Sequence, residues 1–267
     1  MNKWIFFGIG LSGTSAWAGM DGRAIMLKNE EARKVSDVQS QAVIVTGEPG
    51  AVEKTKKFTW WKKLQADKVH YFTLTRFHFP AEVRGEGILF LEHGGEQNNE
   101  VMLYLPTFKK IRRVENAQQS GSFMSSEFSY SDISTPHVDD YKYQLKREEK
   151  CPEAEAAKQQ CFVVQSEPAT DVIRERTGYT KSDLWVRKDN FMMVKAEHYD
   201  GEGKLFKRMI SAKISEVDTK DHKWMSHWIN MENLKTGRYT TLTFDEVKAN
   251  SGIADSIFTQ QNLQRER

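Results

Sequence analysis

The sequence predicts a mainly β protein, built on an antiparallel sheet that is large enough to curl. Segments of strand length follow one another along most of the chain, with no helical pattern between them. Several of the breaks are hairpin turns, among them Asp200-Gly201-Glu202-Gly203 and Lys235-Thr236-Gly237. We find no internal repeat and no linker-like stretch, so we expect residues 19–267 to form a single domain.

Residues 1–18 have the features of a secretory signal peptide. Lys3 is their only charge, Trp4–Leu11 is apolar, and Ala16-Trp17-Ala18 matches an A-x-A cleavage site. A membrane anchor is the alternative, but this apolar core is too short to span a bilayer. No cysteine follows the cleavage site to carry an acyl chain. We therefore expect cleavage after Ala18 and a soluble protein in an exported, oxidising compartment, the periplasm.

A helix is expected over residues 21–40, where Asp21 can cap the N-terminus and Ala24, Leu27, Val35 and Val38 share one face. The short β-branched run Gln41–Thr46 and a turn at 47–50 follow it. The later strands are expected at Val52–Lys62, Lys68–Phe79, Gly87–His93, Glu100–Leu105, Tyr141–Glu148, Phe162–Glu167, Ser182–Lys188, Met192–Tyr199, Leu205–Glu216, Trp224–Asn233 and Tyr239–Val247.

The region from Pro106 to Pro136 differs, because it has a basic cluster, a Gly/Ser break and an aromatic stretch but no clear strand period. We expect short helices or a loop that lies over the sheet. The two cysteines, Cys151 and Cys161, flank a polar loop between two expected strands. An even pair in an exported chain indicates one disulfide, and two cysteines without a nearby histidine do not make a zinc site.

Composition and motifs argue against several function classes. The net charge is +2, and +1 without Lys3, which is too little for a protein that binds nucleic acid through a positive field. The chain has no P-loop, dinucleotide fingerprint or H-E-x-x-H motif, and Gly121–Ser125 lacks the second glycine of a nucleophile elbow. We therefore expect no enzyme activity, no cofactor and no metal.

The aromatic and methionine content is the positive signal. The expected strand Lys68–Phe79 has large apolar residues on both faces: Tyr71 and Phe77 on one, Phe72 and Leu74 on the other. Such strands suit a sheet that packs on both faces or encloses a cavity. Most of these residues are expected to be ordinary core, but methionine also suits a pocket for flexible apolar ligands.

One segment is more specific. The strand ending Tyr104-Leu105-Pro106, the paired Arg112-Arg113, and the run Ser122–Asp132 closely resemble the LolA-like family of outer-membrane lipoprotein-sorting proteins, in its larger periplasmic members. Similar features continue through the chain at Gly178-Tyr179, Leu184–Val186, Asp189, Tyr199–Leu205, Phe258-Thr259 and Leu263.

The resemblance implies an incomplete antiparallel β-barrel, closed by a few helices over an apolar cavity that accommodates acyl chains. It also implies a periplasmic location, and for some relatives an association with resistance-nodulation-division transporters of the inner membrane. The chain departs from the short lipoprotein carrier of that family. A free lipid or another acylated molecule is therefore as plausible a cargo as a lipoprotein.

The candidate ligand-binding residues are Tyr104, Arg112, Arg113, Phe123, Met124 and Phe128. The four apolar side chains are expected to bound the cavity. The two arginines have two interpretations, which carry equal weight. They form a solvated basic cluster with Lys109 and Lys110, paired to Glu115 or Glu127, or they bind a lipid head group at the cavity mouth, for which the guanidinium fork is suited.

Three functions remain in order of preference. The first is a periplasmic carrier or chaperone that binds lipid or acylated ligands and sorts them toward the outer membrane. The second is a non-enzymatic accessory module that docks a transporter of the inner membrane, with its cavity filled by its own side chains. An exported hydrolase comes last, because no nucleophile–base arrangement is visible.

Overall fold

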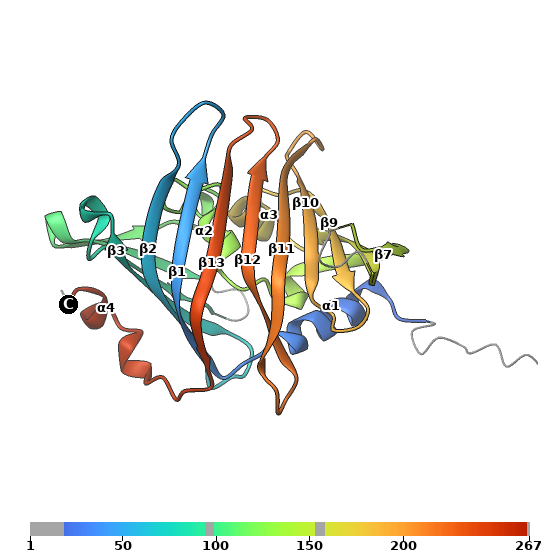
Figure 1. Ribbon diagram of the computed structural model, residues 1–267, viewed down its shortest axis with the longest axis horizontal. Helices are drawn as coiled ribbons and strands as arrows, with labels where there is room; N and C mark the ends of the chain where they lie inside the picture. The colour runs from blue at the N-terminus through green and yellow to red at the C-terminus, as the bar shows by residue number, and fades with distance from the viewer. Residues whose placement is uncertain (1–18, 94–98, 153–157, 266–267) are drawn as a thin grey trace, which may run out of the picture.

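A computed structural model describes residues 19–93, 99–152 and 158–265 (Figure 1). The predicted signal peptide lies outside the described residues. The helices are α1 (Gly22–Ala32), α2 (Tyr130–Ile133), α3 (Asp171–Thr177) and α4 (Gln260–Leu263). The strands are β1 (Asp37–Gly47), β2 (Lys54–Leu64), β3 (Tyr71–Phe79), β4 (Gly87–Leu91), β5 (Glu100–Leu105), β6 (Lys110–Val114), β7 (Tyr141–Lys150), β8 (Gln160–Pro168), β9 (Lys181–Arg187), β10 (Met193–Tyr199), β11 (Leu205–Asp218), β12 (Lys223–Asn233) and β13 (Tyr239–Ala249).

These strands form one 13-stranded antiparallel sheet in the order β6-β5-β4-β3-β2-β1-β13-β12-β11-β10-β9-β8-β7. The sheet curves but does not close, as the predicted incomplete barrel requires, and this expectation is confirmed. Two runs of hairpin-connected strands meet where β1 pairs with β13, with Val43 opposite Thr243. Pairing of the first and last strands therefore places both ends of the β region at the centre of the sheet.

The strand order also explains what covers the sheet. The two edge strands, β6 and β7, follow each other in the chain, so residues 115–140 must cross from one edge to the other. We call residues 115–140 the lid. In Figure 1, α2 of the lid lies behind the sheet, as does α3. The lid side chains Phe123 and Phe128 are buried in one cluster with Phe58 and Phe77 of the sheet.

The opposite, convex face packs against the C-terminal segment, which runs from the lower end of β13 to α4 at the left of Figure 1. Phe258 and Leu263 of this segment are buried in a cluster with Leu74 of β3. Arg76 donates to the carbonyl oxygens of Leu263 at 2.8 Å and Asn262 at 2.9 Å. Strand β3 is therefore covered on both faces, which accounts for its apolar residues on both.

The N-terminal helix is shorter than the sequence predicts. Asp21 caps it as expected, accepting from the backbone nitrogen of Ala24 at 2.7 Å, but the helix ends at Ala32 and residues 37–47 are a strand. The expectation of a helix over 21–40 is therefore wrong in its second half. Pairing on both sides, with β2 and β13, satisfies the backbone of β1 and outweighs the weak helical pattern around Val38.

The middle region is mostly irregular, as expected, with 3₁₀ turns at Pro106–Phe108, Asn116–Gln118, Phe123–Ser125 and Val138–Asp140. It also holds strand β6, which the sequence analysis did not predict. The three charged residues in Lys110–Val114 hide its period, and pairing with β5 makes it a strand. Helix α3 was missed as well. Thr170 caps it through a bond from the backbone nitrogen of Ile173, and Gly178 ends it at a φ of 74°.

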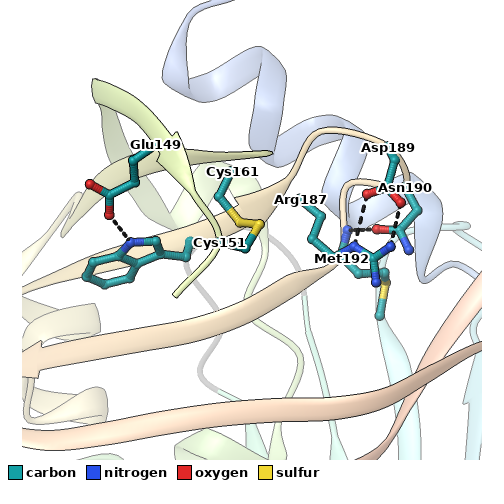
Figure 2. Close-up of a disulfide and its surroundings, with 8 residues drawn as sticks. Glu149, Cys151, Cys161, Arg187, Asp189, Asn190 and Met192 are labelled. Carbon is teal, nitrogen blue, oxygen red and sulfur yellow. Dashed lines mark hydrogen bonds and ion pairs between the residues drawn. A yellow bond between two sulfur atoms is a disulfide. The ribbon is translucent and has the colours of Figure 1, made fainter. Parts of the chain in front are cut away.

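The predicted disulfide between Cys151 and Cys161 is confirmed, and no free cysteine remains in the chain. It joins the end of β7 to the start of β8 (Figure 2), where both residues are buried. Beside it, the Trp185 indole donates to the Glu149 carboxylate at 2.6 Å, which ties β9 to β7. The bridge therefore fixes one edge of the open sheet.

Removing this bridge is expected to lower the free energy of unfolding by about 2–3 kcal/mol, because it closes a loop of 10 residues in the unfolded chain. The test is urea unfolding of the double variant Cys151→Ser/Cys161→Ser against the oxidised wild type. A matched control adds dithiothreitol to the wild type, which should shift the midpoint equally. An unchanged midpoint in both would contradict the expectation.

Candidate functional site

A cavity of about 350 Å³ lies between the concave face of the sheet and the lid. Its size falls within the range of pockets that bind small molecules. The lining combines residues of β2, β3 and β8–β13 with residues of α1 and the lid. Six methionines are among them: Met26, Met192, Met193, Met209, Met225 and Met231. Their flexible thioether chains suit a surface that must adapt to an apolar ligand.

The strands position the aromatic part of the lining by simple alternation. Phe58, Trp60 and Lys62 of β2 all face the cavity, since every second residue of a strand points to the same side. The ring of Trp60 lies 5.0 Å from that of Phe244 on β13, although β1 separates the two strands. Curvature of the sheet brings these side chains together.

Only some of the six sequence-predicted binding residues line the cavity. Phe123 and Phe128 line the cavity. Met124 is partly buried against the same apolar cluster, but it is not among the lining residues. Tyr104 is buried on the other side of the sheet, in the cluster that holds Phe258. Its position in β5 directs its side chain toward the C-terminal segment, because alternate residues of a strand face opposite sides of the sheet.

Arg112 and Arg113 are both exposed on the edge strand β6, outside the cavity lining. Arg113 pairs with Glu100 of the neighbouring strand at 2.6 Å. Glu127, one of the partners considered for these arginines, instead lies 3.1 Å from Arg238. Their positions are those of a solvated basic cluster.

Glu92 fastens the lid to the sheet. Its carboxylate is fully buried and accepts from the backbone nitrogens of Tyr71 and Thr135, each at 2.8 Å. His137 of the lid lies 3.3 Å from it. Burial opposes the charged form, but the His137 bond, the Lys62 charge and the backbone donor together hold the pKa of Glu92 below its usual value. A charged Glu92 thus joins β3 and β4 to the lid.

A second polar group fastens the lid through Asp132 and Asp140, on either side of Thr135 in the chain. The Tyr179 hydroxyl donates to both oxygens of Asp132, at 2.9 and 3.0 Å. Arg176 of α3 pairs with Asp140 at 2.7 Å. Burial raises the pKa of Tyr179 well above its ordinary value, so the hydroxyl remains a donor. Both groups therefore fasten residues 132–140, and the apolar Phe123 and Phe128, which line the cavity, precede them in the lid.

His198 lies beside Tyr179 of this second group, and its burial makes the stability of the fold depend on pH. Its ring lies 4.2 Å from that of Tyr179 and 2.7 Å from the Ser182 hydroxyl, and burial lowers its pKa to about 4. The unfolded chain has an ordinary histidine, so it takes up a proton between about pH 6.5 and pH 4 while the folded chain does not. This residue therefore destabilises the fold as the pH falls through that range.

We expect His198→Gln to flatten the pH dependence of unfolding between pH 6.5 and pH 4, by about 2–3 kcal/mol over the range. Urea unfolding at a series of pH values measures it. The exposed His222, which lies near Glu216, supplies the control variant His222→Gln. If both variants follow the wild-type curve, the burial of His198 does not control this dependence.

Sequence reasoning missed several residues of the cavity. Asn29 and Arg33 come from the end of α1, which was expected to continue as helix. Lys62 alternates with Trp60, and that alternation was a usable signal for a cation on the same face. In the described part of the chain, no three or more His, Cys, Asp or Glu side chains are arranged to hold a metal ion. Across the same residues, no helix is long and apolar enough to cross a membrane.

Solved structures of the same fold span nearly the whole chain. A DUF1329 family protein from Desulfovibrio piger has a TM-score of 0.83 at 25% identity, covering 91% of this chain and 97% of its own. An outer-membrane lipoprotein-sorting protein domain from Vibrio parahaemolyticus has a TM-score of 0.82 at 25% identity, with 91% and 98% covered. A LolA superfamily protein from Nitrosomonas europaea has a TM-score of 0.70 at 23% identity, and the match covers 91% of this chain and 99% of its own.

Of the two sequence comparisons, one finds a match. No curated protein has a significant match to the chain. A family model described as that of an uncharacterized protein matches residues 70–265, which include β3 to β13 and the lid. Together with the open 13-stranded sheet, these matches show that the chain belongs to the LolA-like family.

Proposed function

We propose that this protein is a periplasmic carrier that binds a lipid or an acylated molecule in its cavity and transfers it toward the outer membrane. The observation that carries the proposal is the cavity of about 350 Å³, which is lined by methionine and aromatic side chains and lies beneath an anchored lid. Each methylene that leaves water for such a surface contributes roughly 0.8 kcal/mol, so a partly buried chain binds reversibly.

Two proteins of similar structure support the same function, since one is described as an outer-membrane lipoprotein-sorting domain and the other as a LolA superfamily protein. In the alternative, an accessory module that docks a resistance-nodulation-division transporter, the cavity would be filled by the protein's own side chains. The open volume favours the carrier. Phe123 and Phe128, which line it, are our proposed contacts for the acyl chain.

The test is a titration of the purified protein with N-phenyl-1-naphthylamine, a neutral apolar dye, followed by displacement with palmitate or with an acylated peptide. We expect saturable fluorescence enhancement and competitive displacement. Phe128→Ser should weaken dye binding, whereas the matched change Phe108→Ser, on an exposed turn outside the lining, should not. A folded wild type that binds neither dye nor palmitate would refute the carrier proposal.

A further inference from the structure

Two positive charges lie close together in the lining of the mainly apolar cavity. Arg33 is the residue that ends α1, and Lys62 lies near the end of β2. Lys62 pairs across the sheet with Val38, which also lines the cavity, so both side chains stand on the concave face. Lys62 and Arg33 also repel one another, which places them near each other.

Neither cation has a carboxylate within ion-pair distance among the residues that the structure describes. The Arg33 Nε donates to the backbone oxygen of Asn29 at 3.3 Å, and the rest of its guanidinium fork makes no hydrogen bond to a described residue. The Lys62 ammonium lies 4.1 Å from the centre of the Tyr71 ring. A ring face attracts a cation but accepts little of its hydrogen-bonding capacity.

The nearest carboxylates are engaged elsewhere. Both oxygens of Glu92 accept from the backbone donors described above and lie beside His137. Glu30 accepts from the backbone nitrogen of Val138 at 3.2 Å. The third cation of the lining, Arg176, shows the contrast, because Asp140 pairs with it at 2.7 Å. Among the described arginines and lysines of the lining, Arg33 and Lys62 are thus the two without an ion-pair partner.

This arrangement costs free energy in the empty protein. Burial lowers the pKa of Lys62 to about 8 and lowers that of Arg33 as well, with each charge only partly offset by its surroundings. A bound anion would remove the penalty, because it would supply the missing counter-ion in a water-poor site. Arginine offers a two-bond fork to a carboxylate or phosphate, and lysine adds a mobile point charge.

We propose that Arg33 and Lys62 bind the anionic group, a carboxylate or a phosphate, of an acylated ligand whose hydrocarbon chain lies along the methionine-lined part of the cavity. The inference rests on the proposed carrier function and names the ligand class: an amphiphile with a negative head. It assigns to these two residues the head-group role that the sequence analysis suggested for Arg112 and Arg113.

The experiment compares ligands that share a sixteen-carbon skeleton and differ in the head: palmitate, hexadecyl phosphate and hexadecanol, each displacing N-phenyl-1-naphthylamine. We expect the wild type to bind at least one of the anions ~10-fold or more tightly than the alcohol. Lys62→Met and Arg33→Met should each remove most of that preference and leave the affinity for hexadecanol within about twofold. The better anion identifies the head group.

Controls separate the possible failures. Arg112→Met removes a positive charge from the exposed edge strand and should leave the preference intact. Lys62→Arg keeps the charge and should retain it as well, which guards against a variant that merely misfolds. Equal affinity for hexadecanol and both anions would overturn the inference and leave the carrier standing, whereas no binding of any probe would overturn both. Displacement by acetate or inorganic phosphate alone would show an anion site that needs no acyl chain, and it would also overturn the inference.

Discussion

Ile229→Asp is expected to abolish binding of an acyl ligand while the protein remains folded. Ile229 lies on β12, is only partly buried, and faces the cavity together with Met225 and Met231. In the empty cavity water can hydrate the new carboxylate, so the folded state tolerates it. A bound hydrocarbon chain would have to strip that water, which should raise the dissociation constant at least ~30-fold, or about 2 kcal/mol.

The matched control is Asn230→Asp, one residue further along β12. Asn230 is absent from the cavity lining and accepts a bond from the Thr241 hydroxyl at 3.2 Å. It gains the same charge and should bind the dye as the wild type does. Displacement titrations of both variants, with circular dichroism to establish folding, measure the difference. If Ile229→Asp binds normally, the ligand does not occupy the cavity.

Glu92→Leu is expected to lower the free energy of unfolding by about 3–5 kcal/mol, the largest loss of any single change considered. Leucine fills the space but leaves the backbone nitrogens of Tyr71 and Thr135 buried without an acceptor, and it removes the partner of His137. Two of the three groups that lose their partner, the Thr135 nitrogen and the His137 ring, belong to the lid, whereas Tyr71 belongs to β3. The lid should therefore open before the sheet unfolds.

Urea unfolding gives the magnitude, and amide hydrogen exchange at Thr135 reports on the lid. Glu92→Gln keeps one carbonyl oxygen and should lose less stability. Glu100→Leu removes a partly exposed carboxylate that pairs with Arg113, and it should change stability by less than about 1 kcal/mol. A loss for Glu92→Leu no greater than that of Glu100→Leu would refute the anchoring role.

Most of the sheet could be predicted from the sequence because hairpin signals are local. The Glu100–Leu105 strand has the predicted bounds, and most other strands differ by a few residues at their ends. The predictions of secondary structure are wrong where pairing with strands distant in the sequence determines the local structure. Residues 33–40 follow a weak helical pattern, but β2 and β13 pair with residues 37–40, and β6 is a strand because β5 lies beside it.

The site was harder to predict than the fold. Phe123 and Phe128 could be placed on the cavity because the lid segment has a distinctive pattern. Arg112 and Arg113 belong to the same pattern, but the register of β5 and β6 leaves both exposed. Arg33 and Lys62 lie far apart from that motif in the chain, and only the end of α1 and the β1–β2 register bring them to one wall.

The most direct test of the account is to locate a bound acyl chain. A palmitate analogue with a diazirine at the end of its chain would be bound to the purified protein, photolysed, and mapped by peptide mass spectrometry. Binding inside the cavity predicts saturable labelling of cavity residues, foremost Met193, Met209 and Met225, and its loss on competition with palmitate. Labelling on the convex face around Phe258, or none that saturates, would contradict it.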